Sequence, residues 1–256
     1  MAVQYIGVEE AIERSGLRMV VVGGLPSPWS EAAKGILRVK RIEWAAVRLV
    51  YDDDRLREWA GQRNGPVAIY EKERPRQGWA EILLLAERLA PEPSLIPADP
   101  AERALMFGLS HEICGEAGLG WMRRLQMVHA GLNGQGGFAP PVARYIGKKY
   151  GYTPEGGAAA GRRVAQLLRM LSARLKTQQS AASHYYLGGR LTAVDIYSAA
   201  FVALFRPLPP DVCAMDEANR ASFSLRDAET EAALDPILFE HRDMVYERHL
   251  ELPLSL

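Results

Sequence analysis

The change in secondary-structure signals near residue 97 is the feature that most constrains how this chain can fold. Before it, short β-rich runs alternate with helical patterns, whereas after Pro91-Glu92-Pro93 and Pro97 the strand signals largely stop. Because prolines interrupt regular secondary structure, we interpret residues 91–97 as a linker. The sequence therefore predicts an α/β domain over residues 1–92, followed by an all-helical domain over residues 98–256.

The first half predicts the element order β-α-β-α-β-β-α. Residues 1–16 leave room for a short additional helix ahead of it. The helix expected over 79–90 is apolar almost all round, so it should be buried against the second domain or a twin subunit. The strands are expected at 17–22, 42–51, 66–71 and, poorly marked, after "KERPRQG", and the helices at 30–42, 54–62 and 79–90.

The second half predicts helices separated by short loops. In the third of them, apolar residues recur at the i, i+3, i+4, i+7 spacing of a helix with one buried face. Residues 206–234 are expected to be irregular, with one short helix. The helices are expected over 100–130, 138–150, 157–179, 192–205 and about 235–250.

Charge and cysteine content exclude several classes of protein. Thirty-one basic and 31 acidic residues cancel, which argues against a general binder of nucleic acid or anionic membranes. No apolar run approaches the ~20 residues of a membrane span, and the first residues lack the order of a secretory signal. The two cysteines, Cys114 and Cys213, predict neither a disulfide framework nor a metal site. A reducing cytoplasm is therefore expected.

Two segments of the first half could hold a peptide-like ligand. Pro66 stands at the first residue of an expected strand. It is either an ordinary trans proline or a cis-proline that leaves the backbone of Gly65 free to pair with a ligand. Gln77 and Gly78 stand where a helix begins, and the N–H groups and partial positive charge of a helix start are suited to a carboxylate.

A third segment, "GLPSPWSEAAKG" over residues 24–35, joins a strand to a helix. Ser27 is the expected N-cap, with Pro28 at the favoured first helical position. The same geometry could also hold a thiol, because a serine hydroxyl can donate to a thiolate and the helix dipole favours the ionised sulfur. Together the three segments could converge on one small, anionic, thiol-bearing peptide.

These blocks resemble, in order and spacing, the glutathione transferase superfamily. "LPSPWSEAAKGIL" is similar to the family's first strand-to-helix turn, and "GPVAIYEKERPRQGWAEILLLAERLAPEPSLIPADPAERA" to its proline–strand–strand–helix–linker block. "GGRLTAVDIYSAA" over residues 188–200 is similar to the family's signature in the helical domain. The resemblance covers roughly residues 17–205. It implies a thioredoxin-like glutathione-binding domain followed by an all-helical bundle domain.

The signature in the second half also has a physical meaning of its own. Thr192 and Asp195 stand three residues apart at a helix start, as in a capping box. We expect the Thr192 hydroxyl to accept a backbone N–H, and the Asp195 carboxylate to reach back to the N–H of Thr192. This arrangement would serve folding and not chemistry.

The resemblance implies that glutathione is a co-substrate and gives its site residues. Ser27 would be the catalytic residue that stabilises the glutathione thiolate, with Ser30 as the second choice. A serine here argues against the cysteine-type, deglutathionylating branch. The remaining binding residues implied on this side of the protein are Trp29, Gly65, Pro66, Gln77 and Gly78.

The thiolate would attack an apolar electrophile, whose pocket the helical domain would help to form. Glu112 and Trp121, with Glu116 and Arg124 as neighbours, are expected to shape this pocket. The alternative for Glu112 is a solvated or ion-paired residue with no ligand. A homodimer is also expected, because the nearly all-apolar helix over 79–90 suits burial against a twin subunit.

Gly78 departs from the family pattern, which has a serine at this position. The glycine keeps the backbone N–H but loses the hydroxyl, and one hydrogen bond to a charged group is worth about 1.5–3 kcal/mol. Two alternatives to a transferase follow. One is a non-catalytic dimerisation or protein-binding module, and the other is a glutathione-dependent isomerase.

Overall fold

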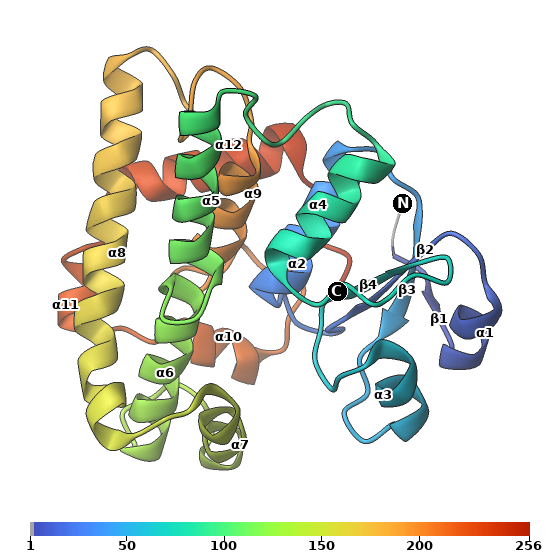
Figure 1. Ribbon diagram of the computed structural model, residues 1–256. Coiled ribbons are helices and arrows are strands. Elements are labelled where there is room, and N and C mark those ends of the chain that lie inside the picture. Colours follow the sequence, from blue (N-terminus) through green and yellow to red (C-terminus); the bar gives the residue numbers. More distant parts are fainter. Residues whose placement is uncertain (1–2) are drawn as a thin grey trace. The chain divides into compact units, whose positions relative to one another are not determined.

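The computed structural model describes residues 3–256, which form two compact units (Figure 1). The first unit runs as far as Leu95 and also includes Pro210–Met215 and His249–Leu256. The second comprises Ile96–Pro209 and Asp216–Arg248. The division near residue 95 lies within the expected linker. The two later segments, expected in the helical domain, instead belong to the first unit.

A four-stranded mixed sheet forms the centre of the first unit. Its strands are β1 (Tyr5–Ile6), β2 (Leu17–Val21), β3 (Trp44–Arg48) and β4 (Val67–Tyr70), in the order β1-β3-β2-β4. The first three are parallel, and β4 pairs antiparallel with β2. Strand β1 was not expected from the sequence. The fourth strand of the sequence analysis is reduced to an isolated bridge between Ala68 and Arg76, next to Pro75, which has no N–H to donate.

Helices cover both faces of this sheet. Helices α2 (Pro28–Val39) and α4 (Trp79–Leu89) pack against each other, and so do α1 (Val8–Glu13) and α3 (Asp54–Ala60) (Figure 1). Strand residues two apart share the core beneath α1 and α3, as the alternation of a β-strand requires. This core contains Ala11, Val20, Val47, Leu49, Leu56, Ala60, Val67 and Ile69. On α4, Leu84 is 46% exposed within the single chain.

The second unit is helical in the residues described. The expected helix over 100–130 is two helices, separated at Gly115–Gly118, because glycine disfavours a helix interior. The segment 206–234 holds two short helices where one was expected; Asp216 and Asp227 cap them. The helices are α5 (Pro100–Cys114), α6 (Leu119–Leu132), α7 (Pro140–Tyr150), α8 (Pro154–Ser180), α9 (Ala193–Val202), α10 (Glu217–Phe223), α11 (Ala228–Glu231) and α12 (Pro236–His249). Among residues 3–256, no helix combines the length and the apolar character needed to cross a bilayer.

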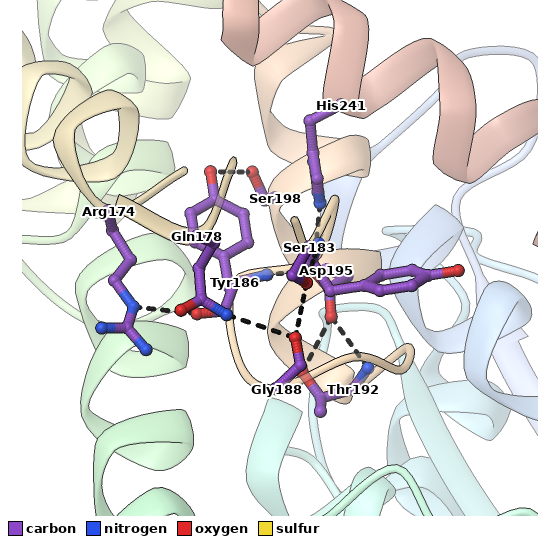
Figure 2. A network of polar contacts seen from close by, with 10 residues as sticks. Arg174, Gln178, Ser183, Tyr186, Gly188, Thr192, Asp195, Ser198 and His241 are labelled. Carbon is purple, nitrogen blue, oxygen red and sulfur yellow. Dashed lines mark hydrogen bonds and ion pairs between the residues drawn. The ribbon is translucent and has the colours of Figure 1, made fainter. Parts of the chain in front are cut away.

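Helix α9 is buried along its whole length and is held by the carboxylate of Asp195 (Figure 2). Asp195 Oδ2 accepts the backbone N–H of Thr192 at 2.8 Å, as expected for a capping box. The Thr192 hydroxyl donates to the same oxygen at 2.8 Å. Asp195 Oδ1 lies 2.9 Å from the backbone nitrogen of Tyr186 and 3.0 Å from His241 Nε2. The carboxylate thus connects α9, the preceding loop and α12.

Replacing Asp195 tests this connection. Asp195→Asn keeps the shape but puts an amide donor where acceptors are needed, and breaking a buried, paired carboxylate site costs about 3–5 kcal/mol. We expect a loss of this order in the free energy of unfolding, measured by urea unfolding followed by circular dichroism. Asp216→Asn, at an exposed N-cap where asparagine serves equally well, is the control and should change little. Equal effects of the two substitutions would contradict the assignment.

Candidate functional site

The turn from β2 to α2 places Ser27 at the start of a helix, as the sequence predicts. The turn passes through Gly24, whose φ of 80° is readily adopted only by glycine. Ser27 is the N-cap residue and Pro28 occupies the first helical position. The Ser27 carbonyl accepts the N–H of Glu31 at 2.8 Å, but its side chain makes no capping hydrogen bond. The hydroxyl is therefore not committed to the helix it precedes.

The neighbouring Ser30 has a structural role. It is fully buried, and its hydroxyl accepts the N–H of Val22 at 3.3 Å. This bond ties the end of β2 to the first turn of α2. Of the two serines, Ser27 is thus the better candidate for holding a thiol. Trp29, between them, is partly buried.

Gly65 and Pro66 lie at the same edge of the sheet as the Ser27 turn. The peptide bond between them is cis. The register pairs Val67 with Val20, so the start of β4 lies beside the end of β2. An ideal Cβ on Gly65 would be 3.3 Å from the Val20 carbonyl oxygen, which leaves little room for a side chain. Two segments about 40 residues apart thus meet where β2 ends.

Gln77 and Gly78 reach this edge through the bridge between Ala68 and Arg76. In an antiparallel pairing, the residues after Arg76 come level with those before Ala68, so Gln77 and Gly78 approach the start of β4. The Gln77 side chain donates to the Ala60 carbonyl at 3.2 Å, which attaches the start of α4 to the end of α3. The three predicted segments therefore lie at one edge of the sheet.

The α4 N-terminus differs from the sequence expectation in one important way. The N–H groups of Gln77 and Gly78, expected to be unpaired, both donate to Glu81 Oε2, at 3.0 and 3.4 Å. The bond from Gln77 lowers the pKa of Glu81, as does Arg74, whose Nη1 lies 2.8 Å from the other carboxylate oxygen. A carboxylate is thus bound where one was predicted, but it belongs to the chain itself. The spacing from Gly78 to Glu81, typical of a capping box, was the signal that could have revealed this.

Glu31, in the first turn after Ser27, is a second acidic group that the sequence analysis did not single out. It is only 6% exposed and pairs with Lys34 at 2.8 Å. Burial raises its pKa to about 7; Lys34 opposes this shift, and the nearby charge of Glu251 adds to it. Lys34 also donates to the Ser255 carbonyl at 2.6 Å. The burial of this pair involves the C-terminal segment, which no local pattern relates to α2.

Two further groups gather at this edge from strands that the site prediction did not use. An ideal Cβ on Gly23 would lie 3.0 Å from Arg48 Cζ and 3.2 Å from the Tyr5 hydroxyl. The Arg48 guanidinium lies 4.7 Å from the centre of the Tyr5 ring. Burial raises the pKa of Tyr5, and its hydroxyl has no hydrogen-bond partner among residues 3–256. This buried hydroxyl could not be placed from the sequence because β1 was not predicted.

The residues predicted for the electrophile pocket lie in the helical unit. Glu112 pairs with Arg163 at 2.5 Å and so links α5 to α8, which favours the ion-paired alternative for this residue. Trp121 packs edge-on against Tyr150, with ring centres 4.6 Å apart. Within residues 3–256, no three histidine, cysteine or acidic side chains are grouped so as to hold a metal ion.

Comparison with solved structures identifies the fold. A glutathione S-transferase from Methylobacterium radiotolerans, in complex with glutathione sulfonate, matches with a TM-score of 0.61 and 15% identity over 91% of each chain. A rice glutathione transferase in complex with glutathione matches with a TM-score of 0.58 and 20% identity over 94% of each chain. Maleylacetoacetate isomerase from Anaeromyxobacter dehalogenans matches with a TM-score of 0.53 and 16% identity, over 90% of this chain and 86% of the other.

Comparisons at the sequence level add no relative. No protein-family profile matches the chain, and no curated protein matches it. The fold is nevertheless that of the glutathione transferases, with a thioredoxin-like domain followed by a helical domain. The fold class expected from the sequence is confirmed.

The raised pKa of Glu31 predicts a dependence of stability on pH. An acid whose pKa is raised on folding binds its proton more tightly in the folded state. Its stabilising contribution is complete below its ordinary pKa of 4.5 and is lost as pH rises to about 7. The shift corresponds to roughly 3 kcal/mol. We expect Glu31→Gln, which imitates the protonated form, to remove this dependence and to stabilise the protein at pH 8.

Urea unfolding of both proteins between pH 4.5 and pH 8.5 measures this effect. The difference in unfolding free energy between the variant and the natural chain should grow across this range and level off above about pH 7. A difference that stays constant with pH would contradict the raised pKa. Glu58→Gln, which removes an exposed carboxylate of α3, controls for the change in net charge.

Proposed function

We propose that this protein is a glutathione-dependent transferase that joins the glutathione thiolate to an apolar electrophile. The observation that carries the proposal is the convergence of the Ser27 turn, Gly65-Pro66 and the start of α4 at one edge of the sheet. The fold supports it, because proteins of this fold have been crystallised with glutathione sulfonate and with glutathione.

Each segment would perform one part of the binding. The backbone of Gly65 would pair with the peptide backbone of glutathione, as an added strand pairs with a sheet edge. The start of α4, at Gln77 and Gly78, would receive the γ-glutamyl carboxylate through backbone N–H groups. The thiol would then lie at the start of α2, where the Ser27 hydroxyl and the helix dipole favour its ionised form.

The reaction requires little more than an ionised, positioned sulfur. The thiol proton passes to solvent, and the sulfur donates an electron pair to an electrophilic carbon to form a carbon–sulfur bond. The leaving group departs with the electron pair of the bond that breaks. A lowered thiol pKa and fixed geometry would supply the acceleration. Ser27 acts as a hydrogen-bond donor throughout. A serine hydroxyl is too weakly acidic to ionise at neutral pH, so it cannot take the thiol proton as a base.

The proposal extends to assembly and location. Leu84 of α4 is 46% exposed, and we propose a homodimer in which this side chain contacts a second copy of the chain. Cys114 and Cys213 are both buried and form no disulfide with each other, which fits a reducing cytoplasm.

One observation favours a second candidate, a non-catalytic binding module with this fold. Glu81 already bonds the N–H groups that a glutathione carboxylate would need. In that case glutathione would not bind at all, so direct binding measurements separate the two candidates.

Replacing Ser27 tests the proposed chemistry. Removing a hydrogen bond to a charged atom costs about 1.5–3 kcal/mol, so Ser27→Ala should lower kcat/KM about 10- to 150-fold. Because the thiol pKa should rise, the rate should recover partly at alkaline pH, while glutathione binding changes little. Calorimetry with glutathione and conjugation kinetics across pH measure both quantities.

The comparison variant for this experiment is Ser30→Ala. Ser30 accepts the Val22 N–H, so its loss should lower stability and leave the pH profile of the rate unchanged. If the natural chain shows no detectable binding at millimolar glutathione, the transferase proposal is wrong.

Replacing Glu81 tests the start of α4. Glu81→Gln weakens the internal anion that competes with the γ-glutamyl carboxylate, so glutathione should bind more tightly. Glu81 is partly exposed, and interactions of such groups are worth up to about 1 kcal/mol, so an improvement of about two- to fivefold is expected. Calorimetry is the measurement, and Glu58→Gln again controls for net charge. Weaker binding to Glu81→Gln would show instead that Glu81 contacts the ligand favourably.

A further inference from the structure

A cavity of about 370 Å³ lies at the start of α5, beside the loop that leads into α9. Two buried residues, Pro97 and Leu187, form its apolar walls, and two exposed charged residues, Glu102 and Arg190, also line it. The volume is within the range of pockets that hold small molecules. All four residues belong to the second compact unit, so the cavity is a feature of the helical unit alone.

The two charged residues of this cavity have opposite charges but are not paired with each other. Glu102 lies in the first turn of α5, and Arg190 lies in the loop before α9. Within residues 3–256, neither side chain has an ion pair or a hydrogen bond with any group. Elsewhere in this unit opposite charges that lie close together do pair, as Arg163 does with Glu112. The cavity thus has an anion and a cation in its lining, and both keep free hydrogen-bonding groups.

The loop that carries Arg190 is fixed on both sides of this residue (Figure 2). Before it, the carbonyl of Gly188 accepts a hydrogen bond from the side chain of Gln178, near the end of α8, at 3.3 Å. After it, the backbone N–H and the hydroxyl of Thr192 both donate to Asp195. None of these bonds uses the Arg190 side chain. A loop held in this way presents a side chain in a defined place, as is typical of binding residues on a rigid scaffold.

Gly189, next to Arg190, also lines the cavity and leaves it open on this side. Its φ does not lie in the left-handed region that favours glycine. An ideal Cβ at this position would meet no atom within 4 Å. Neither the backbone conformation nor the packing therefore requires a glycine here. A large side chain at this position would have room and would occupy part of the cavity.

We propose that this cavity binds a zwitterion of the size of a dipeptide, with an apolar side chain. Its carboxylate would accept charge-assisted hydrogen bonds from the Arg190 guanidinium, whose donors match the two oxygens of a carboxylate. Its ammonium would donate to Glu102, and its apolar part would pack on Pro97 and Leu187. A ligand with a single charge is less suited, because it would meet a like charge in the lining. The inference goes beyond the proposed function, since it holds whether or not glutathione binds.

Titration of the full-length protein with the dipeptide alanyl-leucine, followed by amide chemical shifts in NMR, tests the site. The amides of Gly188 and Gly189 report on the cavity, and those of Gly65 and Gly78 report on the proposed glutathione site. We expect saturable shifts at the first pair, whereas shifts confined to the second pair would overturn the proposal. The blocked dipeptide N-acetyl-alanyl-leucine amide, which lacks both charges, should bind about tenfold more weakly, as expected for the loss of two exposed ion pairs.

Reversal of either charge tests the role of the two charged residues. Arg190→Glu and Glu102→Lys should each weaken binding of alanyl-leucine about five- to twentyfold, because each replaces an attraction with a repulsion. Two exposed residues outside the cavity provide matched controls. Glu155→Lys changes the first turn of α8, and Arg226→Glu changes the loop before α11. Neither control should alter the affinity for the dipeptide.

A third variant, Gly189→Phe, leaves both charges in place and fills the cavity, so it should abolish saturable binding. Circular dichroism and the midpoint of urea unfolding identify any loss of folding in each variant. If one variant fails to fold, the others and the blocked dipeptide decide. The proposal is overturned if Gly188 and Gly189 show no saturable shift or if the blocked dipeptide binds equally well. It is also overturned if the charge reversals act no more strongly than their controls, or if folded Gly189→Phe binds like the natural chain.

Discussion

The antiparallel pairing of β4 with β2 is the constraint on which the proposed site depends. Because Val67 pairs with Val20, the chain that enters β4 through Gly65 and Pro66 runs beside the end of β2, where the turn to Ser27 begins. The short continuation to the bridge at Arg76 then returns the chain to the same edge. A shift of one residue in this register would turn the buried faces of β4 outward and move the start of α4 away. The core residues Val67 and Ile69 therefore hold the site together, although neither takes part in it.

Each helix that begins at this edge carries an acidic residue in its first turn, and the two residues behave differently. Glu81 is partly exposed, bonded to two N–H groups and paired with Arg74, so it remains ionised. Glu31 is buried, and near neutral pH its carboxyl is divided between the charged and neutral forms, since its pKa is about 7. Helix N-termini favour anions in general. Here the electrostatic potential at the two helix N-termini also depends on whether Glu81 and Glu31 are charged. Only the first of them directly occupies a position that the ligand would need.

The sequence predicted the elements that follow from local periodicity and missed those that depend on distant partners. Strand β2, helices α2, α4 and α8, and the capping arrangement of Asp195 all have a local signal, and the structure contains them. Strand β1 has only two residues and exists because it pairs with β3, a contact that no local pattern reveals. The same holds for Glu31, whose burial involves the C-terminal segment through the contact of Lys34 with Ser255. Glu81 was missed for another reason: its spacing from Gly78 was present in the sequence, but the helix start was interpreted only as a place for a ligand.

At the start of α4, the absence of a side chain on Gly78 and the carboxylate of Glu81 affect the same backbone N–H group. With glycine at position 78 there is no hydroxyl to bond an incoming carboxylate, and the backbone N–H is the one donor that remains on that residue. Glu81 bonds this N–H at 3.4 Å, beyond the usual range, but bonds the N–H of Gln77 at a normal 3.0 Å. Gly78 is thus the more weakly held of the two donors. An anionic ligand would therefore compete first for the N–H of Gly78, and Glu81 could keep its bond to Gln77 and its pairing with Arg74 while it did so.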